Sequence, residues 1–186
     1  MSLISGMYGD YEVTKTGNLV GIIEVSGINL DLLNDREQED VFEDYGAFLM
    51  QTLGEGVDDS LQFLEPTIPV NMTAYLNGLK KRYLALQKEQ PEQQFKIQLL
   101  ASYIDHFTQV QESKNMTTKQ HLLIVKVPIK DKSMTSLKLA VTHLEEKLDQ
   151  VKRDLENALT DFDLTAKTLT SQEVQAILKN LINFKG

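Results

Sequence analysis

Two carboxylates of this 186-residue chain occupy positions where acid–base chemistry could take place. Glu24 is the one charged residue in the apolar segment 20–28, and a buried carboxylate there would be a candidate general base. Asp163 belongs to the tripeptide Asp161-Phe162-Asp163, which resembles an acidic metal-binding sequence. The sequence favours simpler roles for both. Glu24 fits the solvent-exposed face of an antiparallel strand, and residues 161–163 fit an acidic turn.

The sequence lacks the patterns that are typical of nucleotide binding, metal binding and thiol chemistry. The chain contains neither G-x-x-x-x-G-K-[ST] nor G-x-G-x-x-G, so we expect no nucleotide binding. His106, His121 and His143 fall in three different predicted elements and lack metal-ligand spacing. The sequence has no cysteine for a disulfide, a zinc site or a thiol nucleophile. We therefore expect no catalytic residue, no metal and no cofactor.

The one partner-binding candidate is a basic run on a predicted helix. Lys80, Lys81 and Arg82 are the only three consecutive basic residues of the chain. They span adjacent faces of the helix, and they could meet anionic lipid headgroups or an acidic protein surface. A solvated helix face is the simpler explanation.

Composition and charge limit the classes of partner. The net charge is −8, so the field of the molecule repels phosphate backbones and we expect no direct nucleic-acid binding. No apolar run approaches the roughly 18 residues of a membrane span, and the first residues lack the features of a signal peptide. We expect a cytoplasmic location. The length allows one domain with a substantial core.

The hydrophobic pattern runs strand–helix–strand twice. The first unit comprises a strand at 20–28, a helix at 35–53 and a strand at 60–70. The second comprises a strand at 120–128, a helix at 136–159 and a short strand at 162–167. This order predicts an α+β fold, specifically a ferredoxin-like two-layer sandwich of two βαβ units. Pro66 and Pro69 place the strand 60–70 at a sheet edge, or leave its second half outside the sheet.

A helical hairpin is expected at about 72–113, inserted into a single domain that covers residues 1–186. Its second helix shows a regular apolar face, which we expect to be packed: Phe95, Leu99, Tyr103, Phe107 and Val110. In helix 35–53 the expected buried face is Val41, Phe42, Tyr45, Phe48, Leu49 and Leu53, with Asn34 as the N-cap. The last helix begins at a capping box, 170–173, and is expected to bury Val174, Ile177, Leu178 and Leu181.

Helix 136–159 carries apolar residues at steps of four and three over three heptads. The members of this stripe are Leu137, Val141, Leu144, Leu148, Val151, Leu155 and Ala158. The period is compatible with a coiled-coil seam. A stripe laid across a sheet is favoured, because predicted strands flank the helix closely.

Two stretches of the chain resemble a known family. Residues 16–39 read T-G-N-L-V-G-I-I-E-V-S-G-I-N-L-D-L-L-N-D-R-E-Q-E. Residues 148–184 contain the end of a long helix, then L-T-D-F-D-L-T-A-K-T-L and T-S-Q-E-V-Q-A-I-L-K-N-L-I-N. In these segments and in its order of elements, the chain resembles the amino-terminal domain of the conjugation and type IV secretion traffic ATPases, especially those of mobile elements from Gram-positive bacteria.

The resemblance implies a domain that precedes a RecA-like motor, docks the ATPase on the membrane channel and helps it assemble. The expected partners are protein components of a conjugation channel at the inner face of the cell membrane, with peripheral membrane association and self-association compatible with that role. The chain ends at residue 186, where the motor would begin, so we expect a fragment or a stand-alone module without ATPase activity. Two alternatives stay open: a ferredoxin-like ligand-binding or regulatory module, and a hydrolase that uses Glu24 and Asp163.

Overall fold

The computed structural model describes residues 4–53, 61–113, 116–131 and 133–182. It divides the chain into two compact units. We call Met1–Pro66 with Gln120–Gly186 the sheet unit, and Thr67–Lys119 the hairpin unit. Each unit is described by itself below. In the described ranges, no helix combines the length and the apolar character that a bilayer span requires.

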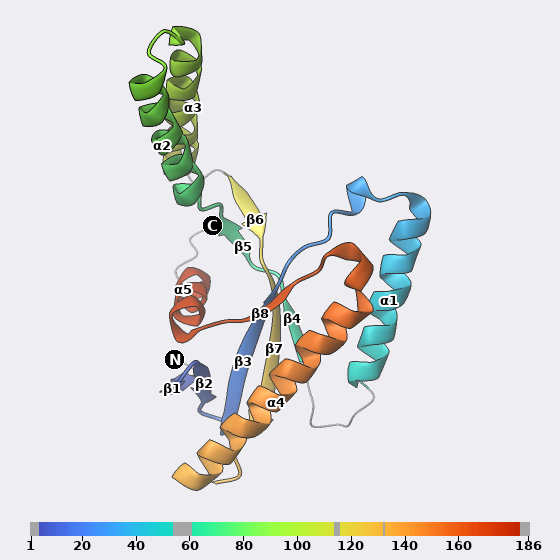
Figure 1. Cartoon of the computed structure of the whole chain (residues 1–186). Coiled ribbons are helices and arrows are strands. Elements are labelled where there is room, and N and C mark those ends of the chain that lie inside the picture. The colour runs from blue at the N-terminus through green and yellow to red at the C-terminus, as the bar shows by residue number, and fades with distance from the viewer. Residues whose placement is uncertain (1–3, 54–60, 114–115, 132, 183–186) are drawn as a thin grey trace. The chain divides into compact units, whose positions relative to one another are not determined.

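The sheet unit is built on an antiparallel six-stranded sheet (Figure 1). Its strands are β1 (Ile4–Tyr8), β2 (Tyr11–Thr14), β3 (Asn18–Val25), β4 (Leu61–Leu64), β7 (His121–Pro128) and β8 (Ala166–Thr168). The order is β1-β2-β3-β7-β4, and β8 also pairs with β3. One edge of β3 pairs with β7 along its whole length, while β2 and β8 share the other edge.

The helices of the sheet unit follow the predicted α+β pattern. They are α1 (Asp35–Leu53), α4 (Met134–Ala158) and α5 (Ser171–Ile182), with short 3-10 turns η1 (Leu30–Leu32) and η2 (Thr160–Phe162). Asn34 is the N-cap of α1, because its Oδ1 accepts from the N–H groups of Arg36 at 3.0 Å and Glu37 at 3.1 Å. The Glu37 carboxylate in turn accepts from Asn34 N–H at 2.9 Å and completes a capping box.

Helix α4 lays its apolar stripe across β3 and β7, which confirms the sheet-packing interpretation (Figure 1). Leu144, Leu148, Val151 and Leu155 are buried in the main core. The approach is so close that a Cβ added at Gly21 of β3 would lie 2.7 Å from Cδ1 of Leu148. Glycine at this position therefore lets the helix reach the sheet.

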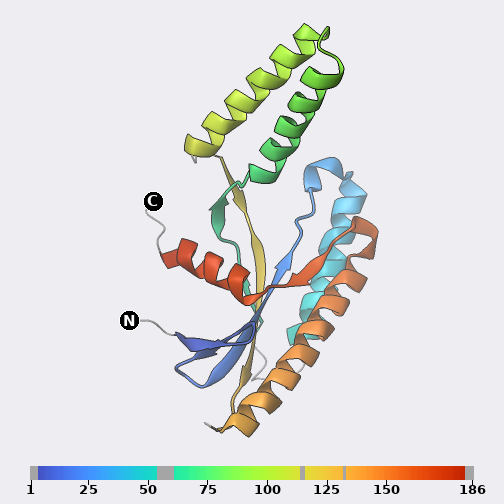
Figure 2. The ribbon, with the colours of Figure 1, turned by 60° about the vertical axis from the view of Figure 1, so that its left-hand side comes forward.

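Helix α5 covers the other face of the sheet, where Val174 and Ile177 pack against Ile22 and Leu122 (Figure 2). The sheet unit therefore has a helix on each face, whereas the sequence predicts a two-layer sandwich. The difference arises because β3 and β7 carry apolar residues on both faces. Leu181, predicted to be buried, is 43% exposed near the end of α5.

The predicted strand 60–70 is two strands. β4 ends before Glu65 and the buried Pro66, and β5 (Thr67–Pro69) pairs with β6 (Thr117–Lys119) in a separate two-stranded ladder. Both consequences predicted from the prolines are confirmed, because β4 lies at the sheet edge and the second half of the segment leaves the sheet.

The hairpin unit contains α2 (Thr73–Glu89) and α3 (Gln94–Ser113), which pack against each other (Figure 2). The prediction that one face of α3 is packed is wrong for the first three residues of that face. Phe95 is 77% exposed, and Leu99 and Tyr103 are also exposed. The partly buried residues are instead on an adjacent face of α3: Ile97, Leu100, Ile104 and Phe107. Helix α3 thus carries two apolar faces, and a single partner helix covers only one.

Candidate functional site

The basic run predicted as a partner site lies on α2 of the hairpin unit. Lys80, Lys81 and Arg82 are all exposed. Consecutive residues of a helix are about 100° apart, so the three side chains spread over about 200° of its surface. Among the described residues, none of the three forms an ion pair. Their charges are therefore available to a partner.

An aromatic cluster lies on the same side of the hairpin as Arg82. The rings of Tyr75 and Phe107 meet edge to face at 5.3 Å, and Tyr103 stacks on Phe107 at 6.2 Å. Arg82 is seven residues from Tyr75, two helical turns along the same face. Tyr75 and Tyr103 remain exposed, as does Leu99, which lies one turn before Tyr103 in α3. The surface thus places aromatic side chains beside an arginine, and both residue types are enriched at protein interfaces.

The structure does not bring Glu24 and Asp163 together. Glu24 is half-buried on β3, accepts a hydrogen bond from Gln120 Nε2 at 2.6 Å and lies opposite Lys167 of β8. Next to this pair, Ser26 N–H donates to the Thr165 carbonyl and Thr165 N–H donates to Ser26 Oγ, each at 2.9 Å. Asp163 lies in the turn before β8, outside the strand pairing that contains Glu24. Glu24 therefore acts as a structural hydrogen-bond acceptor on a central strand of the sheet.

The acidic tripeptide forms a turn, as predicted. Asp161 lies in η2, and Asp163 has a left-handed backbone conformation with φ of 51°. Both line a shallow hollow with the loop after β3, and Glu24 is not part of it. Within the described ranges, no three His, Asp or Glu residues are grouped as they would need to be to hold a metal ion.

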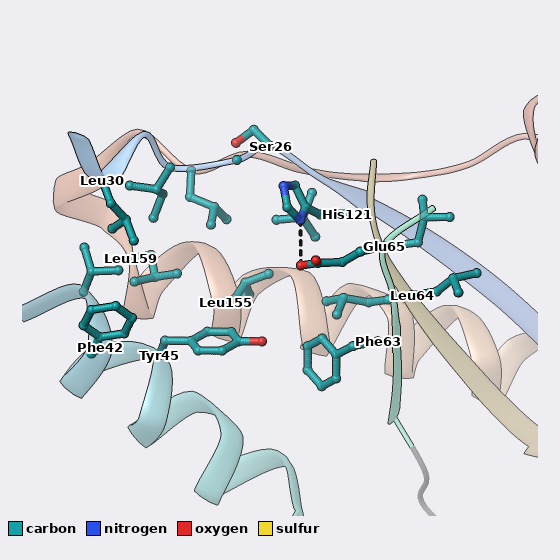
Figure 3. A pocket seen from close by; sticks show the side chains of 17 residues that line it. Ser26, Leu30, Phe42, Tyr45, Phe63, Leu64, Glu65, His121, Leu155 and Leu159 are labelled. Atoms are coloured by element: carbon teal, nitrogen blue, oxygen red, sulfur yellow. Dashed lines mark hydrogen bonds and ion pairs between the residues drawn. The ribbon is translucent and has the colours of Figure 1, made fainter. Parts of the chain in front are cut away.

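Sequence reasoning missed a cavity in the sheet unit. It has a volume of about 270 Å³ and lies between α1, the end of α4 and one end of the sheet (Figure 3). Phe42 and Tyr45 contribute from α1, Phe63 and Glu65 from β4 and the residue after it, and His121 from the start of β7. The floor is apolar and includes Leu155 and Leu159. An apolar cavity with a few polar groups is the usual form of a binding site.

The polar groups of this cavity gather at one side. His121 Nδ1 and Glu65 Oε1 are 3.0 Å apart, and both side chains remain partly exposed. Burial raises the pKa of Tyr45, and the nearby Glu65 charge raises it further. Glu65 and His121 are 56 residues apart in the chain, so no spacing rule could have joined them. Phe42, predicted to be buried, is 61% exposed at the rim.

Comparison with known proteins gives one family. The model of the archaeal TraC-like domain matches residues 9–184, nearly the whole chain. This match is consistent with the amino-terminal domain of a conjugation traffic ATPase, as the resemblance of residues 16–39 and 148–184 predicts. No curated protein matches the chain significantly.

Proposed function

The chain belongs to the archaeal TraC-like domain family, which indicates a role related to conjugation, and we propose that it is a non-catalytic docking and assembly domain of a conjugative-transfer ATPase. The family match over residues 9–184 is the observation that carries this proposal. In this role the domain binds protein components of the conjugation channel at the cytoplasmic face of the membrane. It uses no cofactor and does not contact DNA directly.

The hairpin unit supplies the docking surface in this proposal. Its exposed basic run, Lys80, Lys81 and Arg82, contrasts with a chain of net charge −8 and favours an acidic partner surface. The aromatic cluster around Phe107 supplies apolar contact area beside Arg82. Peripheral membrane association and self-association fit the same exposed surface.

The ferredoxin-like arrangement is part of the proposal. Four strands of the sheet unit follow the order β4-β7-β3-β8, and each neighbouring pair is antiparallel. In chain order β3 and β4 are joined through α1, and β7 and β8 through α4. This order supports two βαβ units in one sheet, extended by β1 and β2 at one edge.

A second candidate function rests on the cavity beside Tyr45 and His121. A stand-alone ligand-binding or regulatory module would need such a cavity. The family match gives no reason to prefer this candidate, and we place the docking role first.

The docking role is tested by reversing the basic run in a cell that carries the conjugative element. The variant with Lys80→Glu, Lys81→Glu and Arg82→Glu should lower the frequency of DNA transfer, because the docking surface would then repel an acidic partner. Its thermal unfolding should stay close to that of the unchanged chain, since the three residues are exposed.

The matched control reverses three exposed lysines of the sheet unit, Lys126, Lys130 and Lys138. This control changes the net charge by the same amount and should leave the transfer frequency unaffected. Equal loss in both variants would attribute the effect to net charge, and no loss in either would remove the basic run from the docking surface.

A further inference from the structure

The cavity of the sheet unit lies beside an unpaired sheet edge. β4 is the last strand of the order β1-β2-β3-β7-β4, and within the described residues its outer edge pairs with no other strand. Successive residues of a strand direct their N–H and C=O groups to opposite edges, so half of the β4 backbone groups point away from β7. Such an edge is a template for an additional strand.

The register of β4 connects this edge to the cavity. Phe63 pairs with Leu123, which belongs to the core beneath α1 and α4, so the Phe63 side chain points to the same face. Its ring meets Tyr45 edge to face at 6.2 Å and stays 43% exposed. A strand added about 4.8 Å beyond β4 would place alternate side chains beside Phe63. One of them would reach the cavity.

The charges around the cavity define the chemistry of the occupant. The first ten residues of α1, 35–44, contain six carboxylates and only one basic residue, Arg36. Glu39 and Glu43 are exposed within one turn of Phe42, and Glu65 follows β4 directly. This surface favours basic side chains on either side of an apolar one.

We propose that the β4 edge and the cavity bind an extended, basic segment of a partner protein. The segment adds a strand to β4, inserts one apolar side chain between Phe42, Tyr45 and Phe63, and directs its basic residues toward the α1 carboxylates. The proposal goes beyond the docking role of Lys80, Lys81 and Arg82, because it concerns another surface in another unit.

Fluorescein-labelled peptides titrated against the full chain test this directly by fluorescence polarisation. The probe is Lys-Thr-Phe-Thr-Lys, whose alternation puts Phe and both Lys on one face of a strand. Three matched peptides replace Phe by Ala, both Lys by Glu, or the second Thr by Pro, which removes a backbone donor. Each should bind about tenfold more weakly or worse, because it loses the anchor, the charge pairing or the strand pairing.

Protein variants locate the binding. Phe42→Ser should weaken binding of the probe because it removes part of the apolar site, and the pair Glu39→Lys with Glu43→Lys should weaken it because it reverses the charge that attracts the probe. All three residues are exposed, so we expect these variants to fold. Leu139→Ser, an equally exposed apolar position on α4, is the control and should change nothing. Reversal of Lys80, Lys81 and Arg82 should also leave peptide binding intact, so failure of this proposal and failure of the docking role are separable.

Three results would overturn the proposal. The first is absence of saturable binding, and the second is equal affinity for all four peptides. The third is tight binding of the proline peptide, because the cavity would then accept a side chain or a small apolar ligand without strand addition. That third result would support the ligand-binding alternative.

Discussion

At the scale of residues, the start of helix α5 is held by one contact that is local in the chain and one that is distant. One arm of the predicted capping box at 170–173 forms, because Glu173 Oε2 accepts from Thr170 N–H at 2.9 Å. The helix start is also joined to a distant residue, since Asp10 Oδ1 accepts from Ser171 N–H at 2.7 Å. No pattern in the sequence predicts the second contact, because tertiary folding alone brings the turn between β1 and β2 to α5.

Acidification should weaken the start of α5 through Glu173. A hydrogen bond from Lys167, together with hydrogen bonds from Thr170, lowers the pKa of Glu173 to about 2. A lowered pKa contributes stability that is present above the ordinary value of 4.5 and is lost as pH falls toward 2. The urea midpoint of the unchanged chain should therefore fall more steeply below pH 4.5 than that of Glu173→Gln. Glu146→Gln, an exposed position on α4, serves as the control and should follow the unchanged chain.

At the scale of elements, the sequence predicted most helices and strands, because their periods are regular. Helix α1 has the predicted bounds, and α4 begins two residues and ends one residue before its predicted bounds. The errors concern which apolar face is covered. Phe42, Phe95 and Tyr103 fit a helical stripe, yet each is exposed, because periodicity gives a face and not the element that covers it. The cavity beside Phe42 was missed for the same reason.

The close packing of α4 on β3 predicts coupled stability effects. Leu148→Ala should cost about 2–5 kcal/mol in the free energy of unfolding, the range for a buried leucine. Gly21→Ala alone should cost about 1–3 kcal/mol, because the added methyl group would overlap the Leu148 side chain. In the Leu148→Ala background the same change should cost less, since the methyl group then fills vacated space.

Denaturant unfolding of the four chains in this cycle measures the coupling. Gly46→Ala is the control: a Cβ added at Gly46 in α1 would contact nothing within 4 Å, and alanine there should be neutral or stabilising. Additive effects of Gly21→Ala and Leu148→Ala would show that the two residues are not in contact.

At the scale of the whole molecule, we assign stability to the sheet unit and docking to the hairpin unit. The sheet unit has a core on both faces of its sheet and provides the stability. The hairpin unit buries little, with Leu76 the one buried apolar side chain among its described residues, and leaves aromatic and basic side chains exposed. Such a division suits a domain that binds partner proteins. The family could be predicted from residues 16–39 and 148–184, whereas the exposed binding surfaces could be identified only from the three-dimensional structure.

The most direct test of the docking role is cosedimentation of the chain with membrane vesicles. Three preparations are compared: inverted vesicles from cells that contain the conjugation channel, the same vesicles without the channel, and liposomes of the same lipids. We expect stronger binding to the channel vesicles than to the other two preparations, and we expect this binding to weaken at high salt and to be lost when Lys80, Lys81 and Arg82 are reversed to glutamate. Equal binding to all three preparations, or binding that the triple reversal leaves unchanged across salt concentrations, would show that this surface does not dock on the channel.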